Sequence, residues 1–233
     1  MVNESITKQD AIEKMAEMWN LLTLSQQQTL EKKMLIYHFK KNECLYKEGE
    51  TVSHFMCLLN GKIKVSMNGI GGRSQIMRVI KPGDFFGYRS YFANELFSTE
   101  GITLECSSIC YIPIKDFSIC LQENARLSFY FLRHLSIDLE AANKRTICLT
   151  QKHIRGRLAE SILFLKENYG LEEDLSTLSI YLSREDLACM SNMTTANAIR
   201  TLSNFAAEKI IAIDGKKIKL IDEEKLKNIS RIG

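Results

Sequence analysis

Apolar residues near the N-terminus recur at helical spacing. Four of them share one face of a helix predicted over residues 8–20: Ile12, Met15, Ala16 and Trp19. Ser25 is a good N-cap residue, so a second, short helix is expected to begin there.

Between Met34 and Pro113 the pattern changes to short apolar runs separated by glycines. Runs of this length that end at turn residues are typical of strands. The predicted strands cover residues 34–39, 55–59, 63–67, 75–80, 102–106 and 109–112. Many short strands at such spacing favour an antiparallel sandwich or roll.

A long helix without proline or glycine is predicted from about residue 124 to 148. Its apolar or small residues follow one another at intervals of three and four: Leu132, Leu135, Leu139, Ala142, Thr146 and Leu149. This is the spacing of a coiled-coil seam, so we expect a homodimer through this helix. The alternative is that the stripe covers the sheet of its own chain.

The basic run of residues 152–157 is interpreted as a hinge, whose charges either contact phosphate or are solvated. An amphipathic helix is predicted over residues 158–169 and an acidic loop over residues 171–177.

The stretch from residue 182 to 221 has the signals of a winged helix-turn-helix. Ser183 and Asp186 are spaced to form a capping box at the start of the first helix. A three-residue turn follows, in which Asn192 tolerates the left-handed backbone that such turns often need. Thr194 then caps a second helix.

The two faces of this second helix differ. Ala198, Leu202 and Phe205 recur at helical spacing and are predicted to pack on the first helix. The other face carries Thr195, Asn197, Arg200, Ser203 and Asn204. Because such side chains hydrogen-bond base edges and phosphates, the helix is predicted to read a DNA major groove.

Two short apolar runs, residues 210–213 and 216–220, flank Asp214-Gly215, which signals a two-residue hairpin turn. The hairpin carries Lys216, Lys217 and Lys219. These lysines are placed to follow a phosphate backbone, as the wing of a winged helix does. The alternative for the whole stretch is a small helical bundle with a lysine-rich surface hairpin.

The composition, with 45% hydrophobic and 25% charged residues, is that of a globular protein. No run approaches the length of a membrane span and no signal-peptide pattern is present, so we expect a cytoplasmic protein.

The net charge is only +3, so DNA binding must depend on where charge is placed. The seven cysteines form no Cys-x-x-Cys pair and most lie among apolar residues, which favours a structural role over a metal site.

The order of these parts resembles the cAMP receptor protein and FNR (Crp/Fnr) family of bacterial transcription regulators. The resemblance covers nearly the whole chain and rests on Gly49-Glu50, Leu59-Asn60-Gly61-Lys62-Ile63-Lys64-Val65, Pro82-Gly83-Asp84-Phe85-Phe86-Gly87, Gly156-Arg157-Leu158-Ala159 and Leu182-Ser183-Arg184-Glu185-Asp186-Leu187. It implies an α+β fold with an antiparallel β-roll of the cyclic-nucleotide-binding, jelly-roll type, a long dimerisation helix and a C-terminal winged helix-turn-helix. The expected bounds are residues 1–123, 124–150 and 151–233.

In cAMP-binding members of that family, a glutamate after the roll glycine holds the ribose and an Arg-Ser pair holds the cyclic phosphate. Here Tyr88 follows Gly87, and Phe97-Ser98 stands at the Arg-Ser pair. Losing that arginine removes the main cation that an anionic phosphate needs, so cAMP is not expected to bind. Arg89 is the alternative anchor, unless it forms an ion pair. The expected effector pocket comprises Phe86, Gly87, Tyr88, Arg89, Phe97 and Ser98.

Oxygen-sensing members hold an iron–sulfur cluster with N-terminal cysteines, whereas no cysteine precedes Cys44 here. Haem-binding members need an axial ligand, and we interpret the four histidines, His38, His54, His134 and His153, as structural. No cofactor is therefore expected.

The family usually has a glutamate on the recognition helix where this chain has Ala196, while Arg200 matches the family arginine. Glutamate accepts hydrogen bonds from cytosine amino groups, whereas alanine offers only a methyl contact. The operator is therefore expected to differ from the well-known family sites.

These observations predict a homodimeric, sequence-specific DNA-binding transcription regulator with an unidentified small-molecule effector. The expected DNA contacts are Ser183, Thr194, Thr195, Ala196, Asn197, Arg200, Lys216 and Lys217. The expected partners are double-stranded DNA, a second copy of the chain and RNA polymerase, with no membrane. One alternative is a module that binds a cyclic nucleotide or other small ligand and acts on a protein partner. The other, an enzyme, lacks any catalytic spacing, metal-ligand motif or phosphate-binding glycine loop.

Overall fold

The computed structural model describes residues 6–69 and 72–232. The chain divides into two compact units, one of residues 1–68 and 77–138 and the other of residues 69–76 and 139–233. Helix α6 (Ala125–Gln151) contributes residues to both. Within the described ranges, no helix combines the length and the apolar composition that crossing a bilayer requires.

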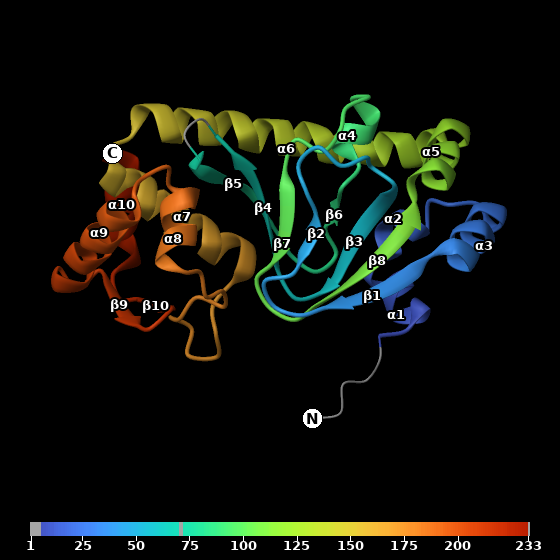
Figure 1. Ribbon diagram of the computed structural model, residues 1–233. Coiled ribbons are helices and arrows are strands. Elements are labelled where there is room, and N and C mark those ends of the chain that lie inside the picture. The colour runs from blue at the N-terminus through green and yellow to red at the C-terminus, as the bar shows by residue number, and fades with distance from the viewer. Residues whose placement is uncertain (1–5, 70–71, 233) are drawn as a thin grey trace. The chain divides into compact units, whose positions relative to one another are not determined.

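Eight strands form the roll, which is drawn in blue to green in Figure 1. They are β1 (Leu35–Phe39), β2 (Cys44–Tyr46), β3 (His54–Asn60), β4 (Ile63–Asn68), β5 (Ser74–Ile80), β6 (Phe85–Phe86), β7 (Glu100–Thr103) and β8 (Ser107–Pro113). They make two four-stranded sheets with the orders β1-β8-β3-β6 and β2-β7-β4-β5. The expected antiparallel roll is confirmed, with neighbouring strands such as β3 and β8 in antiparallel register.

Two strands were not predicted, and one was misplaced. Strands β2 and β6 span only three and two residues, too few to show an alternating pattern. Strand β7 ends at Thr103, whereas the apolar run predicted a strand over residues 102–106. Thr103 is fully buried and its hydroxyl donates to the Lys40 carbonyl at 2.6 Å, so a polar residue ends the strand inside the structure.

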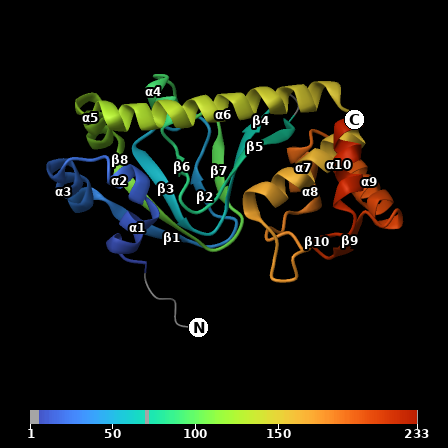
Figure 2. The same ribbon diagram turned by 180° about the vertical axis from the view of Figure 1, so that it is seen from behind.

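The core of the first unit lies between the β1-β8-β3 sheet and the helices that flank it. Phe55 on β3 stacks on Phe117 of α5 (Ile114–Glu123), with ring centroids 3.8 Å apart. Both rings are fully buried, and Phe131 of α6 packs edge-on against them. Figures 1 and 2 show α5 and the N-terminal helices at the same end of the roll.

From residue 6 onward, the N-terminal segment forms three helices, α1 (Lys8–Lys14), α2 (Ala16–Trp19) and α3 (Leu24–Lys33). The single helix predicted over residues 8–20 is wrong, because Met15 leaves helical geometry at ψ 15° and separates two short helices. The N-cap of α3 is Thr23 rather than Ser25. Thr23 forms a capping box with Gln26, which Ser25 does not.

The second unit contains five helices or strands after α7 (Ile154–Tyr169). They are α8 (Arg184–Met190), α9 (Thr195–Ala207), β9 (Ile211–Asp214), β10 (Lys217–Leu220) and α10 (Glu223–Ile232), and Figure 2 shows them from behind. Helix α7 begins four residues earlier than predicted, because His153 is its N-cap, so the basic run lies partly inside it. Helix α10 was not predicted; it packs on α7, its Leu226 is fully buried, and its Glu223 carboxylate accepts from the Lys166 ammonium of α7 at 2.6 Å.

Candidate DNA-binding surface and effector pocket

The start of α8 is fixed by the predicted capping box. The Ser183 hydroxyl oxygen accepts from the Asp186 amide at 3.0 Å, and the Asp186 carboxylate accepts from the Ser183 amide at 3.2 Å. The hydroxyl also donates to that carboxylate at 2.6 Å. The Ser183 side chain, expected to contact DNA, is therefore already used to hold the helix start.

The turn between α8 and α9 also has the predicted geometry. Asn192 adopts a left-handed backbone with φ 48°, which asparagine tolerates better than most residues. The Arg157 guanidinium on α7 donates to the Asn192 carbonyl at 3.0 Å. This bond connects the turn to α7. The left-handed backbone of Asn192 and the bond from Arg157 therefore both stabilise the turn between α8 and α9.

Helix α9 begins at the predicted cap, where the Thr194 hydroxyl oxygen accepts from the Asn197 amide at 3.2 Å. Its inner face, with Ala198, Leu202 and Phe205, is at most 1% exposed. The exposed residues on the rest of the helix are Thr195, Ala196, Ile199, Arg200, Ser203, Asn204 and Ala207, whereas Asn197 is half-buried.

Arg200 is the one cation on the outward face of α9. The side chain is exposed, and it forms no hydrogen bond or ion pair with any of the described residues. A free guanidinium has five donors in a fork that fits guanine or two phosphate oxygens. Its position in the second turn of the helix is where recognition helices contact bases.

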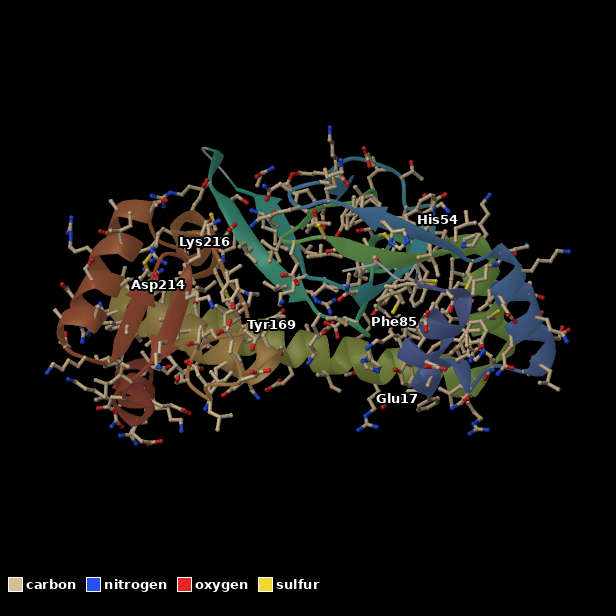
Figure 3. The ribbon with its side chains drawn as sticks, turned by 90° about the horizontal axis from the view of Figure 1, so that it is seen from below. Glu17, His54, Phe85, Tyr169, Asp214 and Lys216 are labelled. Atoms are coloured by element: carbon tan, nitrogen blue, oxygen red, sulfur yellow. The ribbon has the colours of Figure 1, made fainter. Side chains whose placement is uncertain are left out.

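The hairpin of β9 and β10 forms as predicted, but its turn is shifted by one residue. Asp214 pairs with Lys217 in the ladder, so the turn residues are Gly215 and Lys216 rather than Asp214-Gly215. Gly215 supplies the positive φ, at 54°. Figure 3 labels Asp214 and Lys216 on this hairpin. Lys216 therefore lies at the tip, where it is exposed.

The tip is also fastened to α8. The Arg184 guanidinium donates to the Gly215 carbonyl at 2.7 Å. The wing and the first helix of the motif are consequently held in one arrangement.

The other two wing lysines face the acidic loop. The Lys217 ammonium lies 3.4 Å from the Glu172 carboxylate and 5.3 Å from the centre of the Tyr181 ring. The Lys219 ammonium lies 3.4 Å from the Asp174 carboxylate. The predicted set of three phosphate-facing lysines thus divides into one exposed tip residue and two that are already paired.

The acidic loop is itself an ordered element. Backbone hydrogen bonds from Thr177 and Ser176, at 2.8 and 3.0 Å, lower the pKa of the Asp174 carboxyl below its usual range. The carboxylate that faces Lys219 is therefore ionised at neutral pH.

A cavity of about 280 Å³ opens in the first unit. Its lining residues are Tyr46, Val65, Met67, Met77, Arg78, Ile80, Phe86, Gly87, Arg89, Ser90, Ala93, Glu95, Phe97, Ser98 and Thr99. Five of the six residues expected in the effector pocket are among them. Gly87 has φ 81°, a backbone conformation that residues with a Cβ rarely adopt, so glycine is favoured at this point of the wall.

Tyr88 is the expected pocket residue that the structure places elsewhere. Its ring is 3% exposed and lies 5.6 Å from both Phe55 and Phe131, in the core between roll and helices. The expectation that Tyr88 lines the cavity is wrong, because its ring packs against these two buried rings and is not among the lining residues. Tyr88 therefore acts in packing.

The cavity has an aromatic wall and few cations. Phe97 stacks on Tyr46 at 4.1 Å between ring centroids, and both are 6% exposed. The guanidinium of Arg78 forms an ion pair with Asp138 at 3.0 Å. Arg89 is exposed and has no ion pair within the described ranges, so the ion pair considered for it is not formed there.

The predicted seam of α6 is exposed over part of its length. Leu132 and Leu139 are 57% and 64% exposed, and Ala142 and Thr146 are also exposed. Leu135 is half-buried against the core of the roll, so the stripe covers its own sheet at that point. Leu149 is half-buried too.

Two family models match the chain. The cyclic nucleotide-binding domain matches residues 36–124, and the Crp-like helix-turn-helix domain matches residues 156–229. The chain belongs to the Crp/Fnr family. The predicted resemblance is thereby confirmed, together with the antiparallel N-terminal roll and the C-terminal helix-turn-helix.

Other Crp/Fnr regulators align over most of this chain. The probable transcriptional regulator flp of Lacticaseibacillus casei is 26% identical over 183 residues, 78% of this chain and 81% of its own. The CRP-like cAMP-activated global transcriptional regulator of Mycobacterium tuberculosis is 22% identical, over 87% of this chain and 91% of its own. The structure of FixK2 from Bradyrhizobium japonicum has the same fold, with a TM-score of 0.76, 19% identity and coverage of 84% and 96%.

Sequence reasoning missed two exposed apolar residues of this Crp/Fnr chain. Ile199 was not assigned to the outward face of α9, although it is 48% exposed. Phe129, which precedes Leu132 by one helical turn on α6, was not counted with the predicted seam, although it is 72% exposed. The helical spacing of both residues is the signal that could have found them.

Proposed function

We propose that this chain is a homodimeric, sequence-specific DNA-binding transcription regulator in which α9 enters the major groove. The observation that carries the proposal is Arg200, whose exposed guanidinium pairs with none of the residues that the structure describes. It lies on a helix whose start, preceding turn and inner face are all held in place. Because the backbone of the helix is already ordered, only the side chain has to be ordered when it meets base edges. The expected contacts are Thr194, Thr195, Ala196, Asn197, Arg200 and Lys216, with Lys217 and Ser183 contributing less because their side chains are engaged.

The homodimer is supported by the apolar stripe on α6. Leu132 and Leu139 lie seven residues apart on one helix face, and Phe129 continues it toward the helix start, one turn before Leu132. Such a face gains stability when a second copy covers it. A two-fold dimer would present two α9 helices to half-sites about one helical turn of DNA apart.

The same proposal assigns the cavity to a small effector other than cAMP. A cyclic phosphate needs a cation and donors, yet Arg78 is paired with Asp138 and Phe97 fills one wall. Glu95 adds negative charge to the lining, so Arg89 is the one cation left for an anion. Loss of a charge-assisted phosphate contact costs about 1.5–3 kcal/mol.

This part of the proposal is tested by calorimetric titration with cAMP and cGMP. We expect dissociation constants near or beyond the millimolar range. A constant at or below about 1 μM would mean that Arg89 holds the phosphate and that the effector is a cyclic nucleotide.

The proposal includes no enzymatic activity and no haem or iron–sulfur cofactor, and it places the protein in the cytoplasm without a membrane partner. RNA polymerase is the protein partner through which we expect DNA binding to act on transcription.

The decisive experiment is selection of genomic DNA fragments by the purified full-length protein, followed by sequencing. We expect enriched fragments that share an inverted repeat with half-site centres about 10 base pairs apart, or a multiple of that spacing. Absence of any enrichment over non-specific competitor, together with capture of a protein partner, would favour a ligand-binding module that acts on a protein.

A further inference from the structure

Ile199 is an apolar side chain on the face of α9 that points away from the core. It is 48% exposed, whereas the neighbouring Ala198 is fully buried and Leu202 is 1% exposed. Helical spacing places Ala196 and Ser203 next to Ile199 on the same face. A single exposed isoleucine is common on protein surfaces, so a functional role must be inferred from the residues around it.

Those neighbours divide the outward face of α9 into two halves. One half carries Ile199 with Ala196 and Ser203, which are short and uncharged. The other half carries Arg200 and Asn204, whose side chains donate hydrogen bonds. The β-branched isoleucine is not a strong helix former, so helix propensity alone does not account for it at this position.

We propose that Ile199, together with Ala196, reads the C5-methyl groups of pyrimidines, and that thymine stands opposite this half of α9 in each operator half-site. The thymine methyl is the apolar group that base pairs present in the major groove. This inference rests on the proposed function, because it requires α9 to lie in that groove.

The contact selects thymine in two ways. Covering one methyl group with apolar side chains strengthens binding about four-fold. A cytosine at the same place lacks the methyl and presents an amino donor, for which Ile199 and Ala196 have no acceptor. Desolvating the amino group against these two side chains weakens binding further.

The experiment uses the full-length protein and an operator obtained by fragment selection. Each thymine in a half-site is replaced singly by deoxyuridine, which removes only the C5-methyl group. Affinity is measured by gel-shift titration at fixed salt for the wild type, for Ile199→Ala and for Ile199→Val. We expect about a four-fold loss at one or two thymines for the wild type.

In Ile199→Ala that loss should disappear at the same positions, whereas Ile199→Val, which keeps a branched apolar side chain, should retain it.

Cytosine and 5-methylcytosine at these positions form the second comparison, and the operator with 5-methylcytosine should bind more tightly. Equal binding of the two would show that the methyl is not read. Uniform tolerance of deoxyuridine by the wild type, or an unchanged loss in Ile199→Ala, would also overturn the inference. If the wild type selects no fragment, the proposed function fails and this inference fails with it.

Discussion

Helix α9 and the β9–β10 hairpin both carry cations suited to DNA, but they differ in what those cations already contact. Arg200 on α9 is exposed and meets no acidic group among the residues described. On the hairpin, Lys217 and Lys219 lie 3.4 Å from Glu172 and Asp174. The charge of the helix is therefore free to meet DNA, whereas much of the charge of the wing is neutralised within the protein.

The difference shows that counting the lysines of a segment overestimates its electrostatic attraction for DNA when carboxylates lie next to those lysines. An exposed ion pair contributes about 0–1 kcal/mol, so a phosphate can replace the carboxylate at little cost. The carboxylate remains nearby, however, and it repels the phosphate that replaces it. We therefore expect α9 to dominate specific binding and the wing to add a modest, salt-dependent part.

The largest effect should come from dissociating the proposed homodimer, because each DNA site would then meet only one α9 helix and one hairpin instead of two. Changing Leu132 and Leu139 together to lysine puts like charges into the apolar stripe, and the protein should become monomeric. Operator binding should then approach the non-specific range, roughly 4–10 kcal/mol weaker. Sedimentation and gel-shift titration measure the two effects.

Ile137→Lys is the matched control for that double variant, because Ile137 is 56% exposed but lies off the stripe. It should remain dimeric. Leu135 is not used, since its packing against the roll core would confuse loss of the dimer with loss of the fold. An intact dimer in the double variant would place the interface elsewhere.

The next largest effect on operator affinity should come from Arg200 on α9. Arg200→Ala removes an exposed side chain that forms no hydrogen bond or ion pair with another described residue, so the melting temperature should stay unchanged. Operator affinity should fall by roughly 1–3 kcal/mol. Arg200→Lys separates charge from geometry, because lysine keeps the charge but loses the planar fork. Equal affinity of wild type and Arg200→Ala at fixed salt would remove this helix from the groove.

The parts of the fold that could be predicted from sequence are those fixed by local chemistry. The capping box of Ser183 and Asp186, the left-handed Asn192 and the cap at Thr194 each depend on residues within one turn of chain. The roll was recognisable because many short strands have few alternative architectures.

What could not be predicted depends on contacts distant in sequence. Glu172 precedes Lys217 by many residues, and no local pattern indicates that they pair. The packing of Tyr88 against Phe55 and Phe131 depends on the folded core, which aligning residue types does not reveal. Leu135 fits the α6 spacing as well as Leu132 does, and only the packed roll shows that it is covered.

A smaller effect should distinguish the lysines of the wing from one another. Lys216 lies at the tip and forms no ion pair with any of the described residues, so Lys216→Ala should weaken binding similarly across sequences. The slope of log affinity against log salt should become shallower by up to about 0.9. Lys217→Ala should change the slope less, because Glu172 already offsets that charge. Equal slopes for the two variants would show that the ion pair opens on DNA at no cost.

The smallest expected effect runs in the opposite direction. Glu172→Gln removes the carboxylate 3.4 Å from the Lys217 ammonium but keeps the side-chain size and the backbone bond from Glu172 to the Thr177 carbonyl. The fold should persist, because such an exposed pair is worth about 0–1 kcal/mol. With its charge released, Lys217 should meet phosphate, so operator affinity should rise a few-fold and the salt slope should steepen by less than about 0.9. The double variant Glu172→Gln, Lys217→Ala should lose both gains, since the released cation is then absent. If Glu172→Gln binds no more tightly than the wild type at low salt, the acidic loop does not limit the wing, and the contrast between the two surfaces must come from distance to the DNA rather than from neutralised charge.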